Sequence, residues 1–250
     1  MTRLLKLEYF KIRRKKIGLM MTLFLAAEML WAFMSTSMSI ARNPDQAVWA
    51  SILFTVSSMN GLFMPMVTAV VVSRICDMEH KGATWKLLAS FNVSRSRLYA
   101  AKYGCANSLL LVVVLLQAIL IAGFGLMKGV PGNLPVAWLI RFTGGTMLAT
   151  LAVTAIQQWI AMAVKNQAFA LCLGMLGSFA GLTAPLFPAD VRRWLVWSYY
   201  LDLGPVTYQF AESSGSYIAQ PWSPGIAAAA LGTALLFYFA GNLHVARQEI

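Results

Sequence analysis

The chain has 250 residues, of which 59% are hydrophobic and 12% are charged, and its net charge is +11. A soluble domain carries about twice that charged fraction, so the composition excludes an ordinary water-soluble enzyme, a disordered chain and a secreted disulfide-stabilised domain. The 3 cysteines, an odd number, give no basis for a disulfide framework. The sequence predicts an integral membrane protein, in which the distribution of basic residues indicates the side of the membrane on which each segment lies.

The N-terminal segment, residues 1–16, is rich in Lys and Arg. Apolar residues recur among them near helical spacing, which predicts an amphipathic helix lying on the membrane surface. These residues are Leu4, Leu5, Leu7, Phe10 and Ile12. A plain polybasic topology anchor would also explain the charge, and the two interpretations are compatible. The segment is too heavily charged for a signal peptide, and no small-residue cleavage site follows it cleanly.

Six stretches are long and apolar enough to cross a bilayer, which takes about 20 residues. They are residues 17–40, 49–72, 101–127, 138–164, 168–187 and 224–243. No alternating runs indicate a barrel, so we expect a single all-α transmembrane domain with six transmembrane helices. Gly177 and Gly181 in the fifth stretch form a G-x-x-x-G match, which favours either packing within the chain or a subunit interface.

The 20 Lys and Arg residues are unevenly divided between the two sides of this topology. If the N-terminus is inside, the outer segments hold Arg42, Lys128, Arg141, Arg192 and Arg193, and all the others are inside. Lys and Arg accumulate on the cytoplasmic side of membrane proteins, so we expect both termini in the cytoplasm. The basic charge then contacts anionic lipid head groups and needs no nucleic-acid partner.

A few polar side chains lie inside the predicted spans. Glu28 is about 11 residues into the first span, roughly 16 Å deep and near the bilayer midplane. A charged side chain there costs roughly 2.5–3.5 kcal/mol, so Glu28 should face the protein interior or a water-filled cavity. The other deep polar residues are Asn60, Gln117, Gln157 and Gln158. Either this set hydrogen-bonds between helices, or Glu28, Asn60 and Gln117 line a substrate path.

The inner loop between the second and third spans, residues 77–97, has the pattern of a short helix. Trp85, Leu88 and Ala89 are spaced i, i+3, i+4, which gives the segment one apolar face. Ser94 is placed to cap the N-terminus of the third span. We expect a compact helix across the cytoplasmic ends of the two spans, where a soluble partner docks. A solvated connector is the simpler alternative.

The outer segment, residues 188–223, is long for a plain loop and rich in Trp and Tyr. Such residues are typical of the membrane–water interface, so we expect one or two short helices at the outer surface, interrupted at Gly204 and Pro205. The acids Asp190, Asp202 and Glu212, with the aromatic rings nearby, could instead receive a cationic substrate by charge and cation–π contacts.

Motifs for catalysis and nucleotide binding are missing from the sequence. It contains no G-x-x-x-x-G-K-[ST] pattern, and therefore no P-loop for nucleotide phosphates. The two histidines, His80 and His244, are too few and too far apart in the topology for a metal site. Glu28 is the only acid within the spans, which disfavours a membrane-embedded hydrolase. We expect no catalytic residue, metal or cofactor in this chain.

The inner loop carries a recognisable order of residues: an acid, Gly and Thr, an apolar helix, then Ser-Arg and a Lys. This order resembles the cytoplasmic loop of ABC type-2 permeases. The matching residues are Glu79, Gly82, Thr84, Ser94, Arg95 and Lys102, with Ala83 inserted between the Gly and the Thr. The chain length also resembles that of permease subunits of lantibiotic self-protection (immunity) transporters.

The resemblance implies an all-α membrane fold like that of type V exporters, with a coupling helix between spans two and three. Its ATPase-coupling residues would be Glu79, Gly82, Thr84, Trp85 and Arg95. Such permeases lie in the bacterial plasma membrane and pair with a second permease, identical or paralogous. Two ATP-binding subunits carry the ATP and Mg, and the lantibiotic branch expels cationic antimicrobial peptides. A permease for another cargo (a drug, a lipid or an ion) and a non-transporting assembly or sensing protein are the alternatives.

Overall fold

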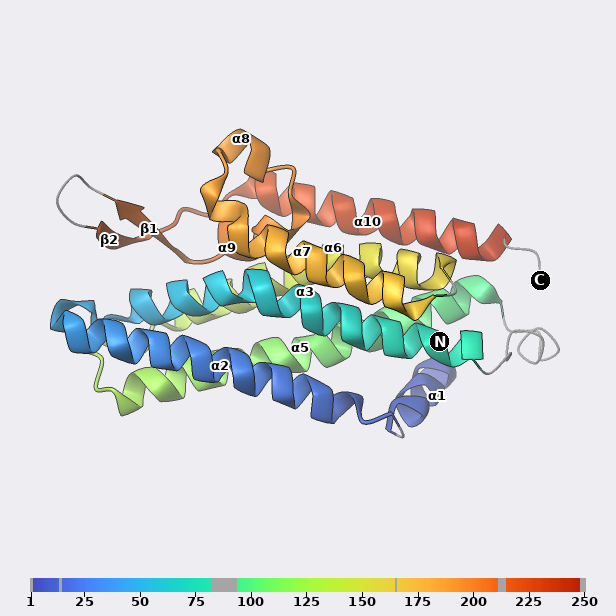
Figure 1. Ribbon diagram of the computed structural model, residues 1–250, viewed down its shortest axis with the longest axis horizontal. Coiled ribbons are helices and arrows are strands. Elements are labelled where there is room, and N and C mark those ends of the chain that lie inside the picture. Colours follow the sequence, from blue (N-terminus) through green and yellow to red (C-terminus); the bar gives the residue numbers. More distant parts are fainter. Residues whose placement is uncertain (1, 14, 82–93, 165, 211–214, 248–250) are drawn as a thin grey trace.

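The computed structural model describes the chain except residues 1, 14, 82–93, 165, 211–214 and 248–250 (Figure 1). The long helices are α2 (Ile17–Arg42), α3 (Trp49–Lys81), α5 (Arg95–Met127), α6 (Val136–Ala163), α7 (Gln167–Thr183) and α10 (Pro224–Arg247). The shorter elements are α1 (Thr2–Arg13), η1 (Pro44–Gln46), η2 (Ala184–Leu186), α8 (Ala189–Arg192), η3 (Val196–Ser198), α9 (Tyr199–Asp202), β1 (Val206–Phe210) and β2 (Gly215–Ala219).

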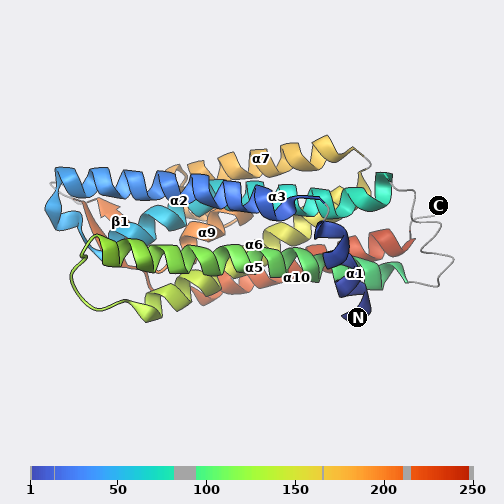
Figure 2. The ribbon, with the colours of Figure 1, turned by 90° about the horizontal axis from the view of Figure 1, so that it is seen from below.

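The part of the chain that the structure describes contains 6 helices long and apolar enough to cross a membrane. They run along the long axis of one bundle, and α1 lies across its end (Figures 1 and 2). This architecture confirms the predicted all-α integral membrane fold. The helices overlap the six predicted stretches, and α3 continues beyond the second stretch to Lys81.

Two ends of the bundle can be distinguished. The end near α1, which also contains the end of α3, the start of α5 and the end of α10, is called the α1 end here. The opposite half of the bundle, with η1 and the two strands at its tip and α8 and α9 nearer the middle, is called the hairpin end (Figure 1). The N-terminal helix α1 and the end of α10 therefore lie at the same end of the bundle (Figure 2).

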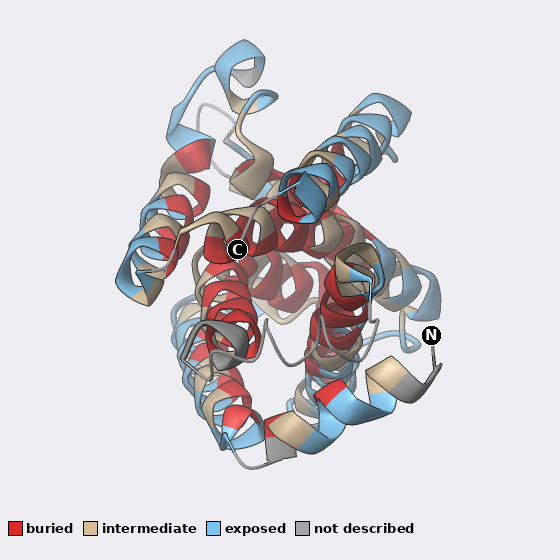
Figure 3. Ribbon diagram, turned by 90° about the vertical axis from the view of Figure 1, so that its right-hand side faces the viewer, coloured by how far each residue is buried: buried red, intermediate tan, exposed pale blue. Residues whose placement is uncertain are grey.

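The centre of the bundle is formed by α3 and α6. In the most apolar 18-residue stretch of each helix, 61% of the residues are buried in α3 and 56% in α6, but only 17% in α10. Figure 3 shows the buried residues facing the interior of the bundle and exposed residues covering its outside. The exposed residues of the long helices include many Leu, Met and Phe side chains. Such an apolar exterior suits a helix bundle whose solvent is lipid, because lipid tails do not drive apolar side chains inward.

The segment after α7 differs from the expectation of short helices alone. It contains the predicted kind of short helices, but β1 and β2 then form an antiparallel hairpin in which Val206 pairs with Ala219 and Phe210 with Gly215. Tyr208 and Tyr217 face each other with ring centroids 5.0 Å apart, and both rings contact Phe54 of α3. Cross-strand aromatic pairs stabilise such hairpins, and packing on α3 adds the support that an isolated hairpin lacks.

The contact between α3 and α7 depends on glycine. A Cβ atom added at Gly61 of α3 would lie 3.0 Å from the carbonyl oxygen of Gly181, and one added at Gly181 would collide with the backbone of Gly61. A Cβ at Gly177 would collide with the Trp197 ring. The G-x-x-x-G match therefore serves packing within this chain, which is the first of the two alternatives that the sequence left open.

Replacing Gly181 with alanine should lower the free energy of unfolding by roughly 1–3 kcal/mol, the usual cost of overpacking. The measurement is thermal unfolding of the purified protein in detergent. Gly123→Ala is the matched control, because a Cβ at this exposed position of α5 meets no atom within 4 Å. Equal melting temperatures for the two variants would contradict the proposed backbone contact.

Candidate functional site

The N-terminal helix α1 has two distinct faces. Leu5, Glu8 and Ile12, spaced i, i+3 and i+7, pack on the bundle, and Glu8 is only 1% exposed. Leu7 and Phe10 point away from the bundle and are more than half exposed. A helix with exposed apolar side chains at the end of a membrane bundle is suited to the lipid interface.

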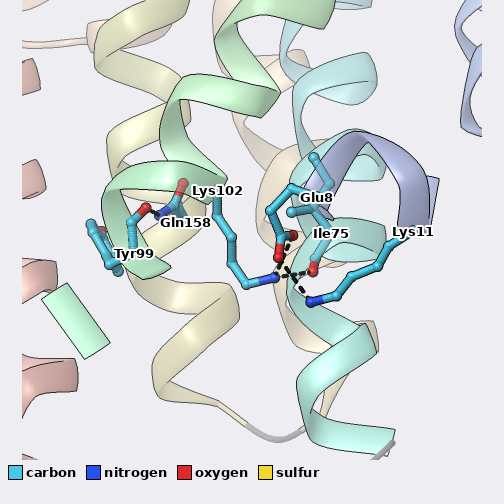
Figure 4. A network of polar contacts seen from close by, with 6 residues as sticks. All are labelled: Glu8, Lys11, Ile75, Tyr99, Lys102 and Gln158. Atoms are coloured by element: carbon cyan, nitrogen blue, oxygen red, sulfur yellow. Dashed lines mark hydrogen bonds and ion pairs between the residues drawn. The ribbon is translucent and has the colours of Figure 1, made fainter. Parts of the chain in front are cut away.

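A buried ion pair fastens α1 to the bundle (Figure 4). The Nζ of Lys102 in α5 lies 3.0 Å from Oε2 of Glu8 and donates a hydrogen bond of 2.9 Å to the backbone oxygen of Ile75 in α3. Lys11 contacts the other carboxylate oxygen of Glu8 at 2.9 Å. Both Glu8 and Lys102 are almost completely removed from solvent. The ammonium group of Lys102 thus joins three helices, α1, α3 and α5.

The start of α5 is also held by α6. The side-chain amide of Gln158 donates to the backbone oxygen of Tyr99 at 2.9 Å (Figure 4). Ser94 caps the N-terminus of α5 by accepting a hydrogen bond of 3.3 Å from the Arg97 amide, as its position in the sequence predicted. The α1 end of α5 is therefore fixed to its neighbours on two sides.

The predicted coupling residues are found at this end as far as the structure describes them. Glu79 lies in the last turns of α3, and Arg95 is the first residue of α5. Gly82, Thr84 and Trp85, with the helix predicted around Trp85, lie outside the described residues. Lys102, which matched the family pattern, sits two turns into α5 in the buried ion pair.

The three polar residues predicted for a substrate path meet in the bundle interior. The side-chain amide of Gln117 in α5 donates to Glu28 of α2 and to Asn60 of α3, both at 2.8 Å. All three side chains are at most 1% exposed. No described Lys or Arg forms an ion pair with Glu28. The cluster lies inside one subunit, where it connects α2, α3 and α5.

The predicted outer acids have different environments. Asp202 is buried, forms an ion pair of 2.9 Å with Arg192 and accepts a hydrogen bond from Ser198. Burial raises the pKa of the Asp202 carboxyl, and the Arg192 guanidinium opposes that increase. Asp190 is exposed, at 3.7 Å from Arg193, and Glu212 lies outside the described residues. Asp202 thus has partners within the fold, and of the three predicted outer acids it is Asp190 that the structure describes at the surface.

Arg141 of α6 binds the segment after α7 at the hairpin end, a role that the sequence did not indicate. Its guanidinium donates to the backbone oxygens of Gly204 and Gln220 and lies 5.7 Å from the centre of the Trp222 ring. The Gln220 side chain in turn donates to the Asp202 backbone oxygen at 2.7 Å. These contacts attach the segment after α7 to α6.

The sequence belongs to a known family. Residues 4–181, more than two thirds of the chain, match the model of the ABC-2 family transporter proteins, and the chain is a member of that family. No curated protein matches the sequence. Together with the six apolar helices, membership defines a multi-pass permease subunit of an ABC transporter, which works with an ATP-binding subunit.

Replacing Lys102 with methionine should lower the free energy of unfolding by roughly 3–5 kcal/mol, because it leaves the buried Glu8 carboxylate without its main partner. The double variant Glu8→Gln/Lys102→Met should recover part of that loss. Lys11→Met is the control, since a partly exposed pair contributes about 1 kcal/mol or less. Thermal unfolding and proteolysis of α1 measure the effect. A Lys102→Met protein as stable as Lys11→Met would refute the tie between α1 and the bundle.

Replacing Gln117 with leucine should cost about 1–3 kcal/mol, because Glu28 and Asn60 both lose their shared donor while remaining buried. Glu28→Gln keeps an acceptor oxygen for Gln117 and should stay close to the wild type. Leu115→Ala, on the exposed side of α5, controls for a change in the same helix. Unfolding in detergent distinguishes these variants, and wild-type stability of Gln117→Leu would show that the cluster does not connect the helices.

Proposed function

We propose that this permease subunit exports cationic amphipathic peptides, as transporters of lantibiotic self-protection do. ATP would be hydrolysed by two separate ATP-binding subunits, and a second permease, identical or paralogous, would complete the transport pathway. Membership of the ABC-2 family carries the proposal of a transport role. The peptide cargo is supported by the chemistry of the hairpin end.

Coupling to the ATP-binding subunits would take place at the α1 end. The proposed contact residues are Glu79, Gly82, Thr84, Trp85 and Arg95. The buried ion pair supports this location, because Lys102 contacts both α1 and the last part of α3. A force applied to the segment between α3 and α5 would therefore move α1 as well. Since 15 of the 20 basic residues belong to this side of the topology, we place both termini in the cytoplasm.

Recognition of a cationic peptide would take place at the hairpin end. Asp190 and Trp194 are strongly exposed there: the Asp190 side chain is 93% exposed and the Trp194 residue is 87% exposed. Carboxylates and aromatic faces both attract cationic groups. The buried cluster of Glu28, Asn60 and Gln117 would affect transport by fixing the spacing of α2, α3 and α5. It would not contact the peptide directly, because all three side chains are buried.

Bacterial cells that carry the complete transporter should survive cationic peptides that kill cells without it. Glu79→Gln should remove this protection, with at least a tenfold fall in the tolerated peptide concentration, because the acid proposed to contact the ATP-binding subunit is gone. Asp45→Asn is the matched control, since Asp45 is an exposed acid of η1 at the opposite end. Membrane levels of both variants are measured by immunoblot.

Two outcomes would contradict the proposal at different points. Normal protection by Glu79→Gln at a normal membrane level would remove Glu79 from the coupling surface. Equal killing with and without the transporter across a panel of lantibiotics would remove the peptide cargo and favour a permease for another cargo.

A further inference from the structure

A groove of about 490 Å³ runs along the exposed side of α2 toward η1. This volume lies in the range of small-molecule binding sites, roughly 300–1,000 Å³. The groove is lined by Trp31, Met34, Ser35, Met38, Ser39, Arg42, Asn43 and Gln46. None of these residues belongs to the proposed coupling surface or to the cluster around Gln117.

The groove changes from polar to apolar along its length. Its mouth at the hairpin end holds Arg42, Asn43 and Gln46, and its other end holds Met34 and Trp31. Trp31 and Arg42 are 11 positions apart in α2, which corresponds to about 16 Å along the helix. That length is close to one leaflet, about half of the 30 Å hydrocarbon core. The groove thus has the length and the polarity gradient of one lipid within one leaflet.

The positive charge of Arg42 at the polar end of the groove favours an anionic ligand. No acidic residue lines the groove, and no described residue forms a hydrogen bond or an ion pair with the Arg42 guanidinium. The Asn43 side-chain oxygen is engaged by the Asp45 amide at 3.1 Å, and the Gln46 side-chain oxygen accepts from Ser39. The amide nitrogens of Asn43 and Gln46 are donors on residues that line the same groove as Arg42, and such a set of donors suits a phosphate group.

We propose that this groove binds an anionic phospholipid of the leaflet at the hairpin end. Its phosphate contacts Arg42, Asn43 and Gln46, and one acyl chain lies along Met38, Met34 and Trp31. Methionine side chains adapt to an irregular chain. A cationic peptide is a poor occupant, because Arg42 would repel it, so this site is separate from the proposed recognition of cargo at Asp190 and Trp194.

The test uses the purified full-length protein, stripped of lipid, and native mass spectrometry. Phosphatidylglycerol and phosphatidylcholine with identical acyl chains are the two probes. The wild type should retain the first phosphatidylglycerol about fivefold more tightly, the ratio expected for one basic residue near an anionic head group. Arg42→Gln should abolish this preference, and Arg42→Lys should restore most of it.

Two further variants separate the groove from general effects. Lys128→Gln removes one charge at the same end of the bundle, from the C-terminus of α5, and should keep the preference. Ser35→Trp fills the groove from an exposed position and should weaken binding of both lipids. Equal losses in Arg42→Gln and Lys128→Gln, or no loss in either, would overturn the proposal. A change in dimer content of Ser35→Trp with unchanged lipid binding would also overturn it, and would identify the groove as a contact with a second copy.

Discussion

The ammonium group of Lys102 is the point on which the α1 end of the bundle depends. It lies between the Glu8 carboxylate and the Ile75 backbone oxygen, so a single charge holds three helices that are separate in the sequence. A buried ion pair is not in itself a large source of stability, because desolvation opposes the attraction. Its effect is on specificity: any arrangement that separates α1 from α5 leaves two ions in a poorly solvated place. The relative positions of α1, α3 and α5 follow from this constraint.

The interior and the hairpin end use weaker contacts for the same purpose. Gln117 connects three helices through neutral hydrogen bonds, and Arg141 attaches the segment after α7 to α6. Close backbone approach at Gly61 and Gly181 brings α7 against α3 without any polar group. In lipid, where apolar side chains gain little by leaving the solvent, such packing and hydrogen bonding are the main sources of association between helices. The subunit is thus fixed at both ends and at its centre.

The fold class could be predicted from the sequence, because an apolar run of about 20 residues has few stable structures other than a membrane-spanning helix. The nearness of Glu28, Asn60 and Gln117 could only be guessed, since it depends on how three helices are rotated about their axes. Glu8 was missed for a different reason: it stands among basic residues that suggest a solvated face, and its partner is far away in the sequence. Lys102 could have pointed to it, because a lysine within an apolar helix needs a nearby anion.

The hairpin shows a further limit of sequence analysis. Val206–Phe210 and Gly215–Ala219 contain β-branched and aromatic residues that favour strands, but Tyr and Trp are equally typical of a membrane interface. Packing of Tyr208 and Tyr217 on Phe54 decides between the two. The family pattern of the inner loop predicted the class of protein from few residues, and the match to the ABC-2 family model confirms that class.

The separation of Glu8 and Lys102 has a consequence for how the chain is made. The two residues are 94 positions apart, so at about 5–20 residues per second a ribosome needs roughly 5–20 seconds to produce the lysine after the glutamate. Throughout that interval Glu8 has no buried partner, and α1 must wait in water or at the membrane surface. Docking of α1 through this ion pair therefore has to follow the synthesis of both α3 and the start of α5. The N-terminus is synthesised first and reaches its final position after helices made later.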